Sequence, residues 1–340
     1  MILSENNKIK IRAALPKKLK WGIAGCSSFA DTVFLPSLQF VKRSKLVAVY
    51  SHDINRAKQF AHRYGAQYSF DDFDEFLRKD FYALYVSSIN SDHYWQVLKA
   101  AKAGKHILCE KPLALNSEQI KEIIKTCKEN NVQLIINHMH RFHPHVIKVK
   151  ELLEKQILGK LVSISTSYHL NRTPDNSFRF KKSMGGGALR DLGSQMIDLL
   201  RYLGGNISEV KPYLDNIVYK SEVEDFAGAI VKFEKTGYGL FNASYNSKKS
   251  FIKADIVGYN GCICIEIYLD KKNIISKLII DLNGEGKKVF RRKINKITFV
   301  IRSVQRSFLR NQPALVTGED GLVNMNIIEE IEKQCISTKN

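Results

Sequence analysis

Three polar side chains follow a run of glycines near the middle of the sequence. Asp191, Gln195 and Asp198 are spaced i, i+4 and i+7, which places side chains on one stripe of an α-helix. Apolar residues in the same segment, at 189, 192, 196, 199, 200 and 203, have the spacing of a second, buried stripe. The pattern predicts that the three polar side chains point together into one site. An ordinary amphipathic helix with a solvated polar face has the same spacing, so this alternative stays open on this segment alone.

A second group of polar residues follows a series of expected strands in the first half of the chain. Strands are expected near 20–24, 45–50, 83–87, 106–109 and 133–137, and helices between them near 54–64, 95–103 and 117–130. This alternation predicts a parallel sheet with helices on both faces, and such sheets bind ligands beyond the carboxyl ends of their strands. The polar residues that leave these ends are Ser51, His52, Ser88, Asn90, Glu110, Lys111 and Asn137.

The first strand leads into a glycine-bearing turn and then a helix, the order that a dinucleotide fingerprint requires. Gly25 takes the first glycine position, Ser27 the second and Ala30 the third. Alanine at the third position still allows close packing of helix on strand. Serine at the second position is a departure, because a side chain there crowds the pyrophosphate. This incomplete fingerprint is weak evidence for dinucleotide binding by itself. The repeated alternation of strands and helices around it strengthens the prediction.

Composition limits the class of protein. The 340 residues predict two domains, and 44% hydrophobic with 26% charged residues is typical of a globular protein. Neither a membrane-spanning stretch nor a secretory signal is expected, and the six scattered cysteines suggest reduced thiols in a cytoplasmic protein. The net charge of +19 favours anionic partners, but no nucleic-acid motif accompanies it.

The basic residues concentrate at Lys8–Lys20 and Lys287–Arg310. Within the second segment, a helical stripe of Ile297, Val300, Ile301, Val304 and Phe308 lies opposite arginines. Such a helix can lie on an anionic membrane, although it packs more often on its own domain. Membrane association is therefore a weaker alternative function.

Several segments together resemble the glucose–fructose oxidoreductase/inositol dehydrogenase (Gfo/Idh/MocA) family. The resemblance covers about Lys20 to Gln334 in the right order. Its motifs are Gly22-Ile23-Ala24-Gly25-Cys26, Ser88-Ile89-Asn90 with His93, Ala103-Gly104-Lys105-His106, Glu110-Lys111-Pro112-Leu113-Ala114, Arg141-Phe142, Gly185-Gly186-Gly187-Ala188-Leu189 with Asp191-Leu192-Gly193, and Thr317-Gly318-Glu319-Asp320-Gly321.

The resemblance implies an α/β fold with an N-terminal Rossmann dinucleotide-binding domain and a C-terminal α+β domain that has a large, mostly antiparallel open sheet. The expected divisions are a basic extension at 1–19, the Rossmann domain at 20–140 and a substrate-binding and oligomerisation domain at 141–340. Independent support for the second part comes from β-rich runs at 162–170, 226–233, 237–245, 252–258 and 262–267. Family members form dimers or tetramers through the open face of this sheet, so a homodimer or homotetramer is expected.

Most of the family transfers a hydride between a nicotinamide and a carbon of a sugar, a cyclitol or a nucleotide-activated sugar. The resemblance implies that Lys111 hydrogen-bonds the reacting oxygen and that Asp191 binds a substrate hydroxyl. The family usually has an acid/base histidine where this chain has Gln195, and glutamine does not titrate near neutral pH. Gln195 then orients the substrate while Lys111 handles the proton, or His169 enters the site, or the chain is a catalytically silent sugar-nucleotide binding homologue.

The expected cofactor is NAD or NADP, with a slight preference for NADP because Ser51-His52 replaces the acidic residue typical of NAD users. The residues expected to contact it are Gly25, Cys26, Ser27, Ser28, Phe29, Ser51, His52, Arg56, Ser88, Asn90, His93, Glu110 and Lys111. Those expected to contact the substrate are Asn137, Arg141, His169 and Arg179.

Basic residues around 172–182 would suit a diphosphate, and hence a UDP-sugar, although a solvated loop, a free sugar or a cyclitol fits as well. Four histidines, His138, His140, His143 and His145, could suggest a metal. No metal is expected there, since neither cysteine nor carboxylate lies nearby in the sequence.

Overall fold

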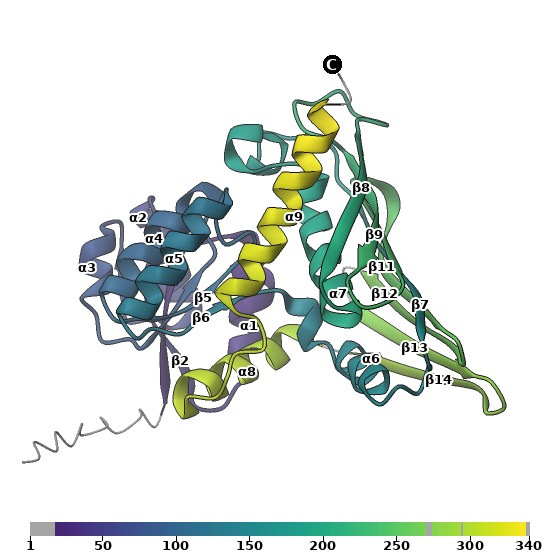
Figure 1. Ribbon diagram of the computed structural model, residues 1–340. Coiled ribbons are helices and arrows are strands. Elements are labelled where there is room, and N and C mark those ends of the chain that lie inside the picture. Colours follow the sequence, from purple (N-terminus) through teal and green to yellow (C-terminus); the bar gives the residue numbers. More distant parts are fainter. Residues whose placement is uncertain (1–17, 270–273, 294, 338–340) are drawn as a thin grey trace, which may run out of the picture.

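The computed structural model describes residues 18–269, 274–293 and 295–337 (Figure 1). The expected basic extension, 1–19, lies almost entirely outside the described residues. The chain forms two sheets with helices between them, and helix α9 (Gly318–Ser337) runs between the two halves of the molecule.

The first sheet confirms the expected Rossmann domain. Its six strands are all parallel and lie in the order β3-β2-β1-β4-β5-β6. They are β1 (Leu19–Ala24), β2 (Ser44–Tyr50), β3 (Tyr68–Phe70), β4 (Ala83–Val86), β5 (His106–Cys109) and β6 (Leu134–Ile136). Central strands such as β4 are buried along their whole length, which shows that both faces of the sheet are covered. The short strand β3 was not predicted.

The helices of this domain follow the expected alternation. They are a π-helical turn η1 (Ala30–Phe34) continued by α1 (Leu35–Leu38), then α2 (Ile54–Tyr64), α3 (Phe73–Leu77), α4 (Asn90–Lys102) and α5 (Ser117–Glu129). Asp53 begins α2 by accepting hydrogen bonds from the backbone N–H groups of Asn55 and Arg56. Helix α3 was not predicted.

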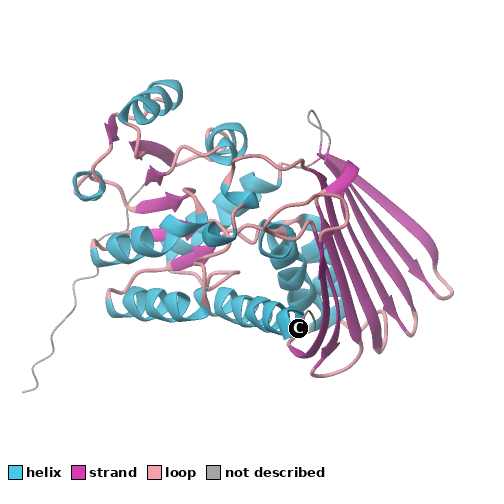
Figure 2. Cartoon of the chain, turned by 90° about the horizontal axis from the view of Figure 1, so that it is seen from above, coloured by secondary structure: helices cyan, strands magenta, loops and turns pink. Residues whose placement is uncertain are grey.

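The second sheet has eight strands in the order β14-β13-β12-β11-β7-β10-β9-β8. They are β7 (Leu161–Asn171), β8 (Ile207–Asp215), β9 (Phe226–Phe233), β10 (Tyr238–Ser244), β11 (Asn246–Gly258), β12 (Gly261–Leu269), β13 (Ile274–Leu282) and β14 (Gly286–Lys293). All neighbours are antiparallel except β7 and β10, which confirms the expected mostly antiparallel sheet. Figure 2 shows helices on one face of this sheet and, among the described residues, none on the other.

The remaining helical segments lie between β6 and β7, between β7 and β8, and after β14. They are η2 (Met139–Phe142), α6 (Pro144–Glu154), η3 (Phe178–Phe180), η4 (Lys182–Met184), the π-helical turn η5 (Leu189–Gly193), α7 (Ser194–Gly204), α8 (Lys296–Arg310) and α9. Segment η2 leads from β6 into α6 and thus joins the two halves. Helix α9 packs on α5 and α7.

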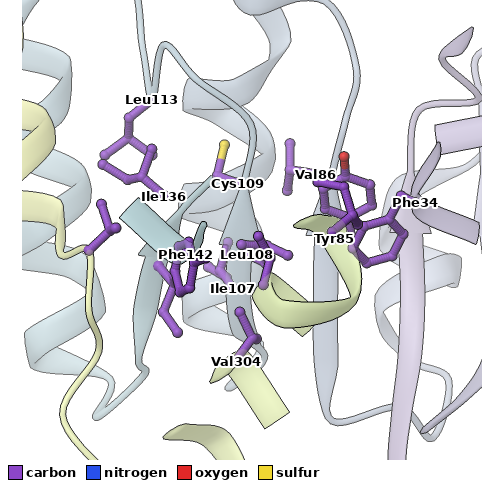
Figure 3. Packing of buried hydrophobic residues seen from close by; sticks show 14 of the residues in the cluster. Phe34, Tyr85, Val86, Ile107, Leu108, Cys109, Leu113, Ile136, Phe142 and Val304 are labelled. Atoms are coloured by element: carbon purple, nitrogen blue, oxygen red, sulfur yellow. The ribbon is translucent and has the colours of Figure 1, made fainter. Parts of the chain in front are cut away.

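Helix α8 returns to the first domain and packs under its sheet. Phe308 stacks on His106 of β5 with ring centroids 5.2 Å apart, and Val304 lies beside Ile107 and Leu108 in the same core (Figure 3). The whole predicted apolar stripe of α8 is buried. It is therefore unavailable to a membrane, and no helix among the described residues is long and apolar enough to span one.

Candidate active site

The two halves of the chain meet at an ion pair between Lys111 and Asp191. Lys111 follows β5, and its Nζ donates to Asp191 Oδ1 at 2.7 Å and to the Asp191 backbone oxygen at 2.5 Å. Both side chains are mostly buried, with 12% and 14% of their surface exposed. An ammonium has three N–H donors. Two are fixed on Asp191, which leaves one for a ligand.

Asp191 is held as a carboxylate by several partners. Its Oδ2 accepts from Arg179 Nε at 3.2 Å and from the Tyr245 hydroxyl at 3.1 Å. Burial alone would raise the pKa of Asp191, but the charges of Lys111 and Arg179 outweigh burial and hold that pKa well below its usual range. Asp191 therefore stays ionised at any ordinary pH and fixes the ammonium of Lys111 in place.

The glycine run allows the chain to deliver Asp191 to this position. Gly187 has φ +107°, and a Cβ there would lie 2.3 Å from Glu224 Oε1. The same carboxylate accepts from the backbone N–H of Leu189 at 2.9 Å, at the start of η5. Burial raises the pKa of Glu224 to about 7. A side chain at Gly187 would therefore displace the group that supports the turn carrying Asp191.

Gln195 lies one turn beyond Asp191, as predicted, and is buried. Its Nε2 is 3.5 Å from the Asp191 backbone oxygen, a long contact, and its Oε1 has no hydrogen-bond partner among the described residues. Buried amide oxygens are normally paired, so the Gln195 oxygen is an unusual unpaired acceptor one turn from Asp191.

Asp198 does not join this site, which corrects the prediction that all three polar residues point together. The π-helical turn at η5 changes the spacing, so the regular α-helical period no longer applies across the segment. Asp198 is fully buried and accepts from Arg141 at 2.7 and 2.9 Å and from Asn324 at 3.0 Å. Arg141 also bonds Asp320 at 3.0 Å, so its guanidinium is committed to carboxylates instead of to a substrate.

The prediction that His169 enters the substrate site also disagrees with the structure. Buried residues on β7 alternate, and Ile164, Thr166 and Tyr168 face the helices. His169 therefore faces the open side of the sheet, where it bonds Asn242 at 2.6 Å and packs on Phe251.

Two tyrosines near Asp191 were missed. Tyr168 faces the site side of the sheet, and burial and the charge of Asp191 both raise its pKa. Tyr245 donates to Asp191 and follows β10. The period-two pattern of β7 could have identified Tyr168, whereas the partner of Tyr245 depends on contacts between distant segments.

The expected dinucleotide edge is formed by the ends of β1, β2 and β4. Gly25 has φ +93°, and a Cβ there would lie 2.4 Å from the backbone nitrogen of Ser88, so only glycine lets the two strand ends approach. Ser27 Oγ accepts from the backbone N–H of Ala30 at 3.1 Å. The Ser27 hydroxyl thus turns back onto the helix, and Ser28 and Phe29 stand in its first turn, where backbone N–H groups have no intrahelical acceptor.

At the end of β2, no carboxylate occupies the position expected of an NAD-preferring site. Ser51 is buried and accepts from the Asp53 backbone N–H at 3.3 Å, while His52 is exposed and bonds Asp92 at 2.9 Å. Arg56 is exposed in the first turn of α2. This edge therefore offers the Ser51 hydroxyl, the His52 imidazole and the Arg56 guanidinium to a ribose or its phosphate.

Other predicted contacts are inward-facing. Cys26 is buried, and burial raises its pKa to about 11. His93 is completely buried between the backbone oxygens of Pro112 and Ser88, at 2.8 and 3.2 Å. These two side chains position the loops instead of facing a ligand. Asn90 donates to the Gly185 backbone oxygen at 3.2 Å and so ties α4 to the glycine run.

Glu110, which precedes Lys111, and Asn137 are joined by a hydrogen bond. Glu110 Oε1 accepts from Tyr85 at 2.6 Å and from Asn137 Nδ2 at 2.5 Å. Burial raises the pKa of Glu110. This network fixes the strand ends on either side of Lys111.

The histidines at 138, 140, 143 and 145 lie in and around η2 and at the start of α6. Among the described residues, no group of three or more histidine, cysteine, aspartate or glutamate side chains is arranged to hold a metal ion. His138 instead lies 3.9 Å from Asp198.

Two family models match the chain. Residues 19–138 match the model described as "Oxidoreductase family, NAD-binding Rossmann fold", and residues 146–264 match "GFO/IDH/MocA C-terminal domain".

Curated relatives and solved structures agree with the family models. The chain is 30% identical over 176 residues to the dTDP-3,4-didehydro-2,6-dideoxy-alpha-D-glucose 3-reductase of Actinomadura kijaniata, covering 52% of this chain and 53% of the relative. It is 29% identical over 256 residues to the scyllo-inositol 2-dehydrogenase (NADP(+)) IolU of Bacillus subtilis (strain 168), covering 73% of this chain and 76% of the relative. The chain spans about half to two thirds of the length of several curated relatives.

A levoglucosan dehydrogenase solved with NADH and levoglucosan has a TM-score of 0.84 at 21% identity, covering 94% of this chain and 97% of that one. At this identity the similarity establishes the fold.

Proposed function

Since the chain belongs to the GFO/IDH/MocA oxidoreductase family, we propose that it is an NAD(P)-dependent oxidoreductase that transfers a hydride between the nicotinamide and a carbinol or carbonyl carbon of a sugar-type substrate. The observation that carries the proposal is the Lys111–Asp191 pair, which lies at the carboxyl end of β5 with one N–H of Lys111 free. This is the edge of the sheet where ligands of such folds bind.

The site residues divide the work according to their chemistry. A bound nicotinamide supplies the hydride donor or acceptor. Lys111 donates its free N–H to the reacting oxygen, and its charge stabilises the alkoxide that develops there. Asp191 holds the ammonium in position, and Gln195 offers its unpaired oxygen to a substrate hydroxyl. Lys111 handles the proton, because Gln195 does not titrate near neutral pH.

The first turn after β1 fits a dinucleotide. Gly25 allows the strand ends to meet, and the N–H groups of the following turn suit a pyrophosphate. Ser51, His52 and Arg56 suit the phosphate of NADP better than the free hydroxyl of NAD. We therefore favour NADP slightly.

Surplus positive charge beside Asp191 favours an anionic substrate, such as a nucleotide-activated sugar. Lys111, Arg172 and Arg179 all act on the carboxylate of Asp191, and the two arginines also act on Asp175, which leaves three cations for two carboxylates. Arg172 Nε is buried without a partner among the described residues, and Arg179 uses only Nε on Asp191. A diphosphate or carboxylate would accept from the remaining guanidinium donors. The A. kijaniata relative, a reductase of a dTDP-sugar by its name, is consistent with this class.

The alternative is a catalytically silent homologue that binds sugar nucleotides. Gln195, which replaces a titratable residue, favours this silent homologue. The intact Lys111–Asp191 ion pair favours catalysis.

A homodimer or homotetramer is proposed through the open face of the second sheet. Large apolar side chains are exposed on that face, namely Ile230, Leu240, Val257, Tyr268 and Ile275. A second copy of the chain would bury them.

Titration calorimetry with NAD, NADH, NADP and NADPH tests cofactor binding. We expect binding heat with at least one of the two redox pairs, NAD/NADH or NADP/NADPH. Adding UDP- or dTDP-sugars to the saturated protein should give a second binding event. Absence of heat with all four dinucleotides would contradict the proposal. Binding of dinucleotide and sugar nucleotide without turnover would favour the silent homologue.

Variants of Gln195 test the orienting role. Gln195→Ala should lower kcat/KM without removing an inflection from the pH–rate profile, since the native side chain does not titrate. Gln195→His adds a group with an unperturbed pKa of about 6.5, so a new inflection should appear at or below that pH, because burial lowers histidine pKa values. Gln67→Ala, an exposed change in the first domain, is the control. Unchanged kinetics in both Gln195 variants would remove this residue from the site.

A further inference from the structure

A buried group of basic side chains lies where helix α8 meets η2 and the start of α6. Its members are His140, His143, His145 and Lys296, exposed by 2%, 0%, 3% and 6%. We call this group the His–Lys cluster. Helix α8 packs on η2, and the rings of His143 and His145 are 5.4 Å apart.

Four imidazole nitrogens of the His–Lys cluster have no hydrogen-bond partner among the described residues. They are both ring nitrogens of His140 and the Nε2 atoms of His143 and His145. The other two nitrogens are used: His143 Nδ1 accepts from the His145 backbone N–H at 3.1 Å, and His145 Nδ1 pairs with Ser276 Oγ at 2.6 Å. Native proteins rarely leave several buried polar atoms unpaired in one place. We therefore expect a bound molecule or ion to pair with these nitrogens.

The cluster also has unbalanced positive charge. Lys296 is the first residue of α8, and within the described chain its ammonium makes neither an ion pair nor a hydrogen bond. Burial lowers the pKa of Lys296 to about 8. Burial also lowers the pKa values of His140 and His143, and the charge of Lys296 lowers both further. Arg292 on the edge strand β14 adds another positive charge toward His143 and His145.

We infer that the His–Lys cluster binds a small inorganic anion, chloride or phosphate, with Lys296 as its charge partner and imidazole N–H groups as its donors. A cation is disfavoured because Lys296 would repel it. Water would satisfy the imidazoles but would not balance a buried ammonium. The anion would join η2, α6 and α8, where the chain passes between its two halves, and this role is independent of hydride transfer.

Thermal unfolding of the full chain tests the inference. Sodium gluconate, whose anion is too large for the cluster, is replaced stepwise by sodium chloride or sodium phosphate at constant ionic strength. A ligand that binds only the folded state raises the melting temperature as it saturates. We expect a saturable rise of about 2–4 °C with one of the two anions, which also identifies it. Equal melting temperatures in all three salts would overturn the inference.

Variants separate an anion from bound water. Lys296→Met should abolish the saturable rise, and Lys287→Met, which removes an exposed lysine of β14, should retain it. If only water fills the cluster, Lys296→Met should raise the melting temperature in every salt, because an uncompensated buried charge is removed. If Lys296→Met does not fold, His140→Leu is used, and it should shift the anion response to several-fold higher concentration. Dinucleotide binding is expected to be unchanged in each variant.

Discussion

Replacing Lys111 by methionine is expected to lower kcat by roughly 10²–10³-fold, or about 2.7–4 kcal/mol of transition-state stabilisation. Methionine fills a similar volume, but it offers no N–H to the reacting oxygen and no charge to balance the alkoxide. The loss should fall mainly on kcat, because the ammonium is proposed to act most strongly as charge develops in the transition state.

Steady-state kinetics with the substrate found by the binding screen measures this effect, and calorimetry checks that the dinucleotide still binds. Lys125→Met is the matched control, since Lys125 is exposed and has only a long ion pair of 3.9 Å. Wild-type kcat in Lys111→Met would exclude Lys111 from the chemical step.

Arg141→Met is expected to reduce the free energy of unfolding by about 3–5 kcal/mol, because it leaves the carboxylate of Asp198 buried without its main partner. Chemical denaturation measures the change. Arg302→Met, an exposed arginine on α8, is the control and should stay within about 0.5 kcal/mol of wild type. The double variant Arg141→Met/Asp198→Leu should recover much of the loss, since no charge is then buried alone.

The stability that Arg141→Met loses should become smaller as the pH falls. Burial would raise the pKa of Asp198, but the charges of His138 and Arg141 outweigh it and lower that pKa. A carboxylate with a lowered folded-state pKa stabilises the protein above its unfolded pKa, about 3.9, and loses that contribution as the pH falls through the folded value. The difference between wild type and Arg141→Met should therefore shrink in acid. A loss below about 1 kcal/mol at neutral pH would contradict a structural role for Arg141.

Local patterns predicted the regular parts of the fold. Alternating strands and helices gave the parallel sheet, and the apolar stripe of α8 identified that helix from Ile297 to Phe308. The short elements β3 and α3 were missed because three to five residues carry little periodicity. Strand β13 and the two edge strands of the second sheet, β8 and β14, were also missed. Strand β14 is exposed along its whole length and so lacks the alternation that marks a half-buried strand.

Site positions that follow from a sequence motif could be predicted. Positions that depend on tertiary contacts could not. Lys111 and Asp191 meet as expected. His169 was wrong by one residue, since a single step along a strand moves a side chain to the other face. Asp198 was expected to point into the site with Asp191 and Gln195, and Arg141 was expected to contact the substrate. Sequence spacing cannot reveal the π-helical turn or the buried partners Asn324 and Asp320.

Transfer of a labelled hydride tests the central proposal most directly. The protein is given reduced nicotinamide cofactor, deuterated on the transferring face, and a panel of keto-sugars and keto-sugar nucleotides, and the products are analysed by mass spectrometry. We expect one deuterium at a carbinol carbon of one class of product, present with wild type and lost with Lys111→Met. Cofactor and sugar binding with no deuterium in any product would contradict the proposed hydride transfer and favour a silent binding protein.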